Sequence, residues 1–227
     1  MHSSSIKSYV LRTGKMTIAQ KRSYNELSGV YCLQINKEII DYKKAFGNSN
    51  PVIIEIGFGS GIATAQIAEE NPEHNYLGIE VYKSGIGKLL WEIQKRGLKN
   101  IRIIEGDAAE IVKLLPKNAA KGFHIFFPDP WPKKRHYKRR LITRPFTDTL
   151  AYCLLKKGYI YMTTDWENYA DWAMAELLST PGLVNKFKGF ALTQDWRPKT
   201  SFEKKGLEKN HKIHELYFLK DAVNEKK

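Results

Sequence analysis

Five acidic residues stand at the ends of short hydrophobic runs, and they are the residues of this sequence best suited to chemistry. They are Glu55, Glu80, Asp107, Asp129 and Asp165. Carboxylates attract the positively charged groups of a ligand and accept hydrogen bonds from its hydroxyls and amines. A single acid at the end of a strand commonly caps the helix that follows. Five acids along one edge of a sheet instead favour a site for a cofactor and a substrate.

A glycine-rich segment, EIGFGSG, follows the first hydrophobic run and contributes Gly57, Gly59 and Gly61. Glycine permits positive φ and lets a ligand approach the backbone, and the helix that follows offers free N–H groups. NAD, FAD and S-adenosylmethionine (SAM) binders all use loops of this kind. The spacing here is G-x-G-x-G, which differs from the G-x-G-x-x-G of the dinucleotide fingerprint. We expect Glu80 to accept both ribose hydroxyls of the cofactor and Asp107 to lie near its adenine.

The stretch FHIFFPDPWPKKRHYKRR presents Asp129 directly after a hydrophobic run. Pro128 and Pro130 restrict the backbone on both sides, so the carboxylate should leave the strand in a defined direction. Trp131 is expected to offer a flat face on which a nucleobase stacks. The cationic residues that follow are expected to neutralise the backbone phosphates of a nucleic acid. This combination predicts a nucleobase held next to a cofactor.

The overall charge points to the same class of partner. The 227-residue chain has 37 Lys and Arg against 24 Asp and Glu, which leaves a net charge of +13. Such an excess favours a polyanion, with nucleic acid ahead of an anionic membrane. No apolar run has the length of a bilayer span, and the first residues lack the apolar core of a secretory signal. Cys32 and Cys153 lack metal-ligand spacing. We therefore expect a cytoplasmic protein that binds no membrane and no metal.

A regular alternation of strands and helices should position these residues. From residue 51 onward, β-branched hydrophobic runs alternate with segments whose apolar residues have helical spacing. The expected strands are 51–57, 75–81, 101–107, 122–129 and 158–165, and the expected helices are 60–71, 83–97, 108–116, 144–158 and 166–180. Strands of nearly continuous hydrophobicity, each followed by a helix, predict a doubly wound α/β domain with a mostly parallel sheet.

The two ends of the chain differ from this pattern. Residues 1–27 carry several basic residues with a single acid near their end, and we expect a mobile basic N-terminal arm there. The remaining residues, 28–227, are expected to form one domain. Residues 189–193 and 214–219 are expected to add an antiparallel hairpin at the edge of the sheet.

Taken together, these segments resemble the bacterial tRNA (guanine-N7)-methyltransferase family. The similarity rests on EIGFGSG, GIE, GD, FPDPWPKKRH, TTDW and TSFEKKG, and it extends to the N-terminal LRTGKMT. The pattern FPDPW-x-K-x-R-H is the most specific of these elements, whereas many methyltransferases share the glycine loop. The resemblance implies a Rossmann-like, class I SAM-dependent methyltransferase fold with tRNA as the partner. It also implies methyl transfer to N7 of guanine 46, in the variable loop of tRNA.

The resemblance further implies roles for individual residues. Glu55, Gly57, Gly59, Gly61, Glu80, Asp107 and Asp129 correspond to the SAM site, and Asp129 is also the expected catalytic residue. Guanine-side contacts are expected from Lys133, Asp165, Thr200, Ser201, Phe202 and Glu203. RNA contacts are expected from Arg135, His136, Tyr137, Lys138, Arg139 and Arg140. Some relatives have Arg where this chain has Ser201, which weakens the expectation that position 201 itself contacts the substrate.

The chemistry of N7 methylation suggests what these acids do. Neutral guanine has a lone pair and no proton at N7, so the reaction requires no general base. Our hypothesis is that Asp129, helped by Asp165 and Glu203, accepts hydrogen bonds from the N1–H and N2–H₂ groups of guanine. Adenine lacks this pair of donors and would be rejected. A nearby carboxylate also favours the positive charge that develops on the base.

Three alternatives remain open from the sequence. A base-amine methyltransferase is one, because PDPW is similar to the D-P-P-Y loop that binds an exocyclic amine. A nucleotide-dependent oxidoreductase is disfavoured by the glycine spacing and by the cationic block. A non-catalytic RNA-binding module would keep the basic surface without binding SAM. The sequence does not decide between a monomer and a homodimer.

Overall fold

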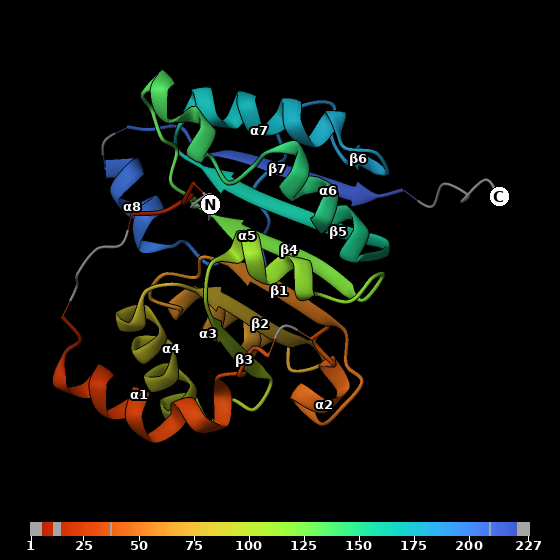
Figure 1. Cartoon of the computed structure of the whole chain (residues 1–227). Helices are drawn as coiled ribbons and strands as arrows, with labels where there is room; N and C mark the ends of the chain where they lie inside the picture. Colours follow the sequence, from red (N-terminus) through yellow and green to blue (C-terminus); the bar gives the residue numbers. More distant parts are fainter. Residues whose placement is uncertain (1–5, 11–14, 37, 209, 222–227) are drawn as a thin grey trace, which may run out of the picture.

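The computed structural model describes residues 6–10, 15–36, 38–208 and 210–221. Its strands are β1 (Val52–Ile56), β2 (Asn75–Glu80), β3 (Ile101–Glu105), β4 (Ala120–Phe126), β5 (Leu154–Thr164), β6 (Leu183–Asn185) and β7 (His214–Lys220). Within these residues they form one seven-stranded sheet in the order β3-β2-β1-β4-β5-β7-β6 (Figure 1). β1 to β5 run parallel, and β7 runs antiparallel to its neighbours β5 and β6. The predicted fold class is confirmed.

Helices cover both faces of the sheet (Figure 1). They are α1 (Ile18–Tyr31), α2 (Tyr42–Phe46), α3 (Ile62–Glu70), α4 (Lys83–Arg96), α5 (Ala108–Ile111), α6 (Arg144–Cys153), α7 (Glu167–Ser179) and α8 (Ser201–Glu208), with 3₁₀ turns η1 (Val112–Leu114) and η2 (Lys134–Arg139). Ile53 packs in one apolar cluster with α3 and α4, while Ile54 packs in a second cluster with α6 and α7. Because neighbouring strand residues point to opposite faces, a doubly covered sheet requires nearly continuous apolar strands.

The prediction for residues 144–158 was wrong in its second half. The expected helix ends at Cys153, and β5 begins at Leu154. Along β4, Ala120 pairs with Leu154 and Gly122 already pairs with Tyr159, so residues 155–158 form an irregular bulge. Lys157 in this bulge has φ 62°, a left-handed conformation. The bulge interrupts the two-residue strand period, which is why LLKKG looked like the end of a helix.

The predicted edge hairpin was also wrong in its first strand. The edge strand is β6 at residues 183–185, and it pairs with the far end of β7. Residues 189–193 form no strand, although the Ala191 amide donates a hydrogen bond of 2.6 Å to the Glu215 carbonyl. β7 therefore lies inside the sheet, between β5 and β6, and a long connection separates the two antiparallel strands.

The N-terminal region contains an ordered helix that packs on the domain. Thr17 caps α1 in a capping box with Gln20, so the helix start has a local cause. A Cβ on Gly87 of α4 would lie 2.6 Å from the Gln20 carbonyl oxygen, which shows how closely α1 and α4 approach. The predicted division between residues 27 and 28 falls inside α1. Residues 1–5 and 11–14 of the predicted arm lie outside the described residues, and its mobility stays a prediction.

The topology gathers the functional candidates at one edge. Because β1 to β5 are parallel, their carboxyl ends share one edge of the sheet. The chain adds β2 and β3 on one side of β1 and then crosses to add β4 and β5 on the other side, so the topological switch point lies between β1 and β4. Ligands of doubly wound folds bind in the crevice at such a switch point. Among the described residues, no helix combines the length and the apolar character needed to cross a membrane. The described His, Cys, Asp and Glu side chains form no group of three or more that could hold a metal ion.

Candidate active site at the carboxyl edge of the sheet

The glycine loop after β1 leaves open space beside its backbone. Gly57, Gly59 and Gly61 have φ of 71°, 60° and 68°, in the left-handed region that favours glycine. A Cβ added to Gly57 or Gly59 would meet no other atom within 4 Å. At Gly61 a Cβ would lie 2.6 Å from the Leu89 side chain, so that glycine allows α3 and α4 to pack. The first two glycines therefore form a cradle, and the third serves the packing of helices.

Glu80 ties this loop to the end of β2. One carboxylate oxygen accepts the Gly59 amide at 2.7 Å, and the other accepts the amides of Val81 at 2.7 Å and Tyr82 at 3.1 Å. A carboxylate has about four acceptor positions. These three bonds leave acceptor capacity on the carboxylate, and its expected contact with the ribose hydroxyls of the cofactor stays a prediction. Burial raises the Glu80 pKa, an effect that its backbone hydrogen bonds oppose.

Glu55 is a buried carboxylate with an unsatisfied oxygen. Its residue is only 3% exposed, and Oε2 has no hydrogen-bond partner within the described structure. Burial raises the pKa of Glu55 to about 7. The hydroxyl of Thr64, at the start of α3, is also buried and lies close enough to Glu55 to lower the pKa of that carboxyl, an effect smaller than that of burial. Buried polar atoms of native proteins are nearly always satisfied. Glu55 therefore fits a site in which a polar ligand supplies a partner for Oε2.

Asp107 meets the N-terminal segment of the chain. One oxygen caps α5 by accepting the Ala109 amide at 3.1 Å, and the other lies 3.1 Å from Lys7 Nζ. The segment 6–10 is held further by Trp131 Nε1, which donates to the Ser8 carbonyl at 2.9 Å. Its last residue, Val10, accepts a hydrogen bond from the Tyr82 hydroxyl. Residues 6–10 thus lie along the carboxyl edge, from the end of β4 to the end of β2.

Asp129 lies at the surface, beyond the end of β4. Its side chain is exposed, and its charge raises the pKa of the nearby Glu80, after the larger effect of burial. Phe127 and Trp131, on either side of the P-D-P turn, have φ of 51° and 47°. Bulky residues rarely adopt positive φ, and such strain gathers at functional sites. The strained turn thus places Asp129 at the surface, close enough to Glu80 for its charge to act on that carboxyl.

Trp131 does not offer a free face to a base, in contrast to our expectation. The ring is 9% exposed, and the Arg139 guanidinium stacks 3.7 Å above its centre. The same guanidinium donates to the carbonyls of Lys7 and Tyr9, each at 2.9 Å. Trp131 and Arg139 together therefore hold the N-terminal segment in this conformation.

Arg140 is a structural residue, and the expected RNA contact needs correction. It is 3% exposed, and its guanidinium donates to the Pro130 carbonyl at 3.0 Å and to Asn168 Oδ1 at 2.7 Å. The guanidinium also stacks 3.7 Å from the Tyr137 ring. A buried cation held in this way has no access to phosphate. Its bond to Pro130 instead braces the turn that carries Asp129.

The remaining cationic residues of this stretch lie on the surface. Lys133, Lys134, Arg135 and Lys138 are exposed on and around η2. His136 and Tyr137 are half-buried, and the Tyr137 hydroxyl donates to Asn168 Oδ1 at 2.9 Å. The pKa of His136 is lowered by partial desolvation and by the surrounding cations. The exposed members form a compact cationic surface beside Asp129, which suits a polyanion.

Asp165 directly follows β5 and faces the segment that carries α8. Its Oδ2 lies 3.1 Å from His211 Nδ1, and a Cβ on Gly206 would lie 3.1 Å from the same oxygen. Thr200 Oγ1 caps α8 by accepting the Glu203 amide at 3.1 Å. The side chains of Ser201 and Phe202 lie outside the described part of the chain. Asp165 and Thr200 therefore flank the same short helix.

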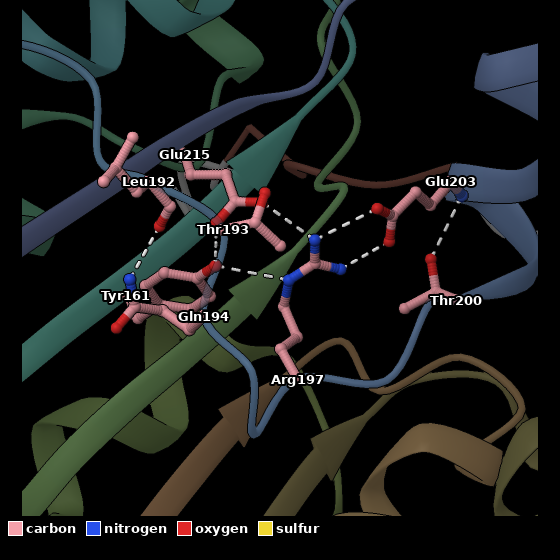
Figure 2. A network of polar contacts seen from close by, with 8 residues as sticks. All are labelled: Tyr161, Leu192, Thr193, Gln194, Arg197, Thr200, Glu203 and Glu215. Atoms are coloured by element: carbon pink, nitrogen blue, oxygen red, sulfur yellow. Dashed lines mark hydrogen bonds and ion pairs between the residues drawn. The ribbon is translucent and has the colours of Figure 1, made fainter.

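Glu203 is buried and paired with Arg197, and its expected contact with guanine stays a prediction. Its residue is 4% exposed, and both carboxylate oxygens accept hydrogen bonds from Arg197 (Figure 2). Arg197 was not among the predicted site residues, and neither were Lys7 and His211. Only the basic character of Lys7 gave a signal in the sequence. His211 meets Asp165 at the end of β5, and Arg197 meets Tyr161 and Glu215 on two strands in addition to the nearby Glu203, contacts that sequence spacing does not reveal.

Fold comparison defines the class of protein. The chain is similar to the crystal structure of the 16S rRNA methyltransferase KamB, with a TM-score of 0.61 and 13% identity over 82% of this chain and 96% of that chain. It is also similar to a putative methyltransferase from Thermoplasma acidophilum, with a TM-score of 0.51 and 15% identity over 81% of this chain and 76% of that chain. Together with the glycine cradle and the acids at the strand ends, these likenesses define a class I methyltransferase fold.

Sequence comparison gives the family. A family described as "Putative methyltransferase" matches residues 49–216. A protein of Dechloromonas aromatica named tRNA (guanine-N(7)-)-methyltransferase is 45% identical over 96% of this chain and 89% of its own length. One of the same name from Treponema pallidum is 41% identical over 95% of this chain and 96% of its own. The chain belongs to the tRNA (guanine-N7)-methyltransferase family. The family and the fold imply a methyl donor of the SAM type.

Proposed function

We propose that this protein transfers the methyl group of SAM to N7 of guanine 46 in the variable loop of tRNA. The names of the relatives support the reaction and its substrate. One structural observation carries the proposal: the glycine cradle, Asp129 and the exposed cations of η2 occur together at one edge of the sheet. A cofactor site, an acid that orients the base and a surface for phosphate are thereby neighbours.

The residues around the glycine loop fit SAM, which supplies a positively charged methyl donor when it is bound. Glu55 has a buried, unsatisfied oxygen that suits the ammonium of the donor. Gly57 and Gly59 leave the backbone open to a ligand. Glu80 has acceptor capacity left for the ribose hydroxyls, and Asp107 can accept from an amine once Lys7 has moved away. Each residue offers an acceptor, and SAM is rich in donors and positive charge.

Asp129 is the residue best suited to orient the guanine. Its carboxylate is exposed and lies close to Glu80, at the border between the glycine loop and the cationic surface. From there it can accept from N1–H and N2–H₂, with Asp165 as a second acceptor. N7 needs no proton removed, so the acids act by alignment and by favouring the positive charge that develops on the base. Adenine would leave these acceptors without donors.

The exposed residues Lys133, Lys134, Arg135 and Lys138 can bind the phosphates around the target nucleotide. Phosphate contacts fix the position of a nucleic acid but carry no direct base information. Recognition therefore divides into two parts. The cationic surface provides affinity, and the acids at the strand ends select guanine.

Transfer of labelled methyl from SAM to unmodified tRNA transcripts tests this proposal. One transcript keeps guanine at position 46 and a matched transcript has adenine there. Strand scission that is selective for N7-methylguanosine then maps the product. The proposal expects label and cleavage at position 46 of the first transcript alone. Label that resists this scission, in either transcript, would favour the base-amine reaction and refute the proposal.

A further inference from the structure

A buried cluster of charged side chains lies beside the candidate site (Figure 2). Arg197 stands at its centre, on the connection between β6 and α8. Its guanidinium donates to both oxygens of Glu203, one of them at 3.1 Å, and to Glu215 Oε1 at 2.9 Å. Its Nε donates to the Tyr161 hydroxyl at 3.2 Å, and that hydroxyl donates to Glu215. One cation thus links α8 to the adjacent strands β5 and β7.

The cost of burial makes a purely stabilising role a poor explanation. The side chains of Arg197, Glu203 and Glu215 are 1%, 5% and 3% exposed. Taking charges out of water costs several kcal/mol for each ion, and replacing buried ion clusters by apolar residues is often neutral or stabilising. The cluster also has two carboxylates, Glu203 and Glu215, for one guanidinium, so the charges of its ion pairs do not balance. What it provides beyond stability is a defined geometry, because a bidentate fork fixes the orientation of both partners.

The helix oriented by this fork is α8, which carries Glu203. It has eight residues, and a helix this short is not stable alone in water. Its first turn is held by the Thr200 cap and by the fork between Arg197 and Glu203. Its last turn lies against Asp165, where Gly206 leaves no room for a Cβ without a close contact. The fork therefore determines how α8 is seated over Asp165.

We infer that Arg197 is a positioning residue for the guanine-binding side of the active site. It docks Glu203, and through Glu203 it sets the placement of Thr200 and α8 relative to Asp165. Glu203 serves as the docking partner of Arg197, which donates to both of its carboxylate oxygens. This inference rests on the proposed function, because it assigns α8 and Asp165 to the guanine side.

The test compares Arg197→Lys with the wild-type enzyme. Lysine keeps the charge but cannot form the planar fork. We expect kcat to fall by about 10–100-fold, because small misplacements of an orienting group have effects of this size. The dissociation constant of SAM and the KM for tRNA should change by less than about threefold, because the glycine loop and the cationic surface are untouched. Arg144→Lys is the matched control, since Arg144 pairs with Asp148 on α6, away from the carboxyl edge, and it should keep full activity.

A second variant protects the test against misfolding. Glu203→Gln weakens the same fork from the other side, and its effect on kcat should not add to that of Arg197→Lys in the double variant. Unchanged kcat in Arg197→Lys, or a parallel loss of SAM affinity, would overturn the positioning role. The wild-type assay separates the two proposals: without N7 methylation by the wild-type protein the proposed function itself fails. An active wild type with an equally active Arg197→Lys variant refutes only the role of Arg197.

Discussion

Lys7 Nζ lies 3.1 Å from Asp107 Oδ2, although the two residues are 100 positions apart in the sequence. The ion pair brings the N-terminal segment to an acid that the family resemblance assigns to the SAM site. Trp131 and Arg139 hold the backbone of the same segment through the carbonyls of Ser8, Lys7 and Tyr9. In this conformation the segment and a bound cofactor would share one carboxylate oxygen.

Lys7→Ala should therefore strengthen SAM binding slightly. The ammonium of Lys7 is half exposed, and exposed ion pairs contribute up to about 1 kcal/mol. Removing this competitor for Asp107 should lower the dissociation constant of SAM by at most about fivefold, as measured by calorimetry. Lys15→Ala, in an exposed residue of the same arm, serves as the control. Weaker SAM binding in Lys7→Ala would mean that Lys7 supports the site.

Glu55 should give the ligand-free protein a distinctive pH dependence. Burial raises its pKa from 4.5 in the unfolded chain to about 7 in the folded protein. Between these values the folded state keeps a proton that the unfolded state has lost, so this group lowers stability as pH rises through the window. Relative to the wild type, Glu55→Gln should gain up to about 3 kcal/mol of unfolding free energy between about pH 4.5 and about pH 8. Urea unfolding at both pH values measures this, and a constant difference would contradict the assignment.

Asp129→Asn should impair methyl transfer while leaving the protein folded. The side chain is exposed, so a neutral amide of the same size fits without a cavity. The amide loses the negative charge and one acceptor, and removing an oriented electrostatic interaction typically costs about 10²–10³ in kcat. Single-turnover rates with saturating SAM and tRNA measure the effect, and thermal unfolding serves as the folding control. Normal turnover in this variant would remove Asp129 from the mechanism.

The cationic surface on η2 should control the salt dependence of tRNA binding. Removing one cation that binds a phosphate reduces the slope of log affinity against log salt by about one. The double variant Lys134→Ala, Arg135→Ala should therefore reduce the magnitude of the slope by about two, measured by filter binding between low and moderate salt. The matched control is Lys43→Ala, Lys44→Ala, an exposed pair on α2. Equal slopes in both double variants would show that η2 does not bind the phosphates.

The sequence was sufficient to predict the sheet, because β1 to β4 are short, apolar and followed by helices or helical turns. It failed where local pattern and tertiary pairing disagree. In β5 the bulge at residues 155–158 breaks the strand period, and only pairing with β4 shows that Leu154 belongs to the sheet. At residues 189–193 the alternation of apolar residues is typical of a strand, but the segment forms none and meets β7 through the backbone bond from Ala191 to Glu215.

The candidate site divides in the same way. Acids at strand ends and the glycine loop could be placed from sequence, because a parallel sheet puts these positions on one edge. The partners of those acids could not. Arg140 and Trp131 looked like surface residues in a charged stretch, yet Asn168 and Arg139 cover them. The ion pairs of Arg197 with Glu203 on α8 and Glu215 on β7 could be recognised only from the fold.

A single-atom change in the substrate tests the central claim most directly. A tRNA transcript with 7-deazaguanine at position 46 keeps the N1–H and N2–H₂ edge but has a carbon atom in place of N7. The edge that Asp129 is proposed to hold is unchanged, so this transcript should bind as tightly as the guanine transcript and inhibit the enzyme. It should accept no methyl group from labelled SAM. Methyl transfer to the 7-deazaguanine transcript at the rate of the guanine transcript would show that another atom is the acceptor and would contradict the account.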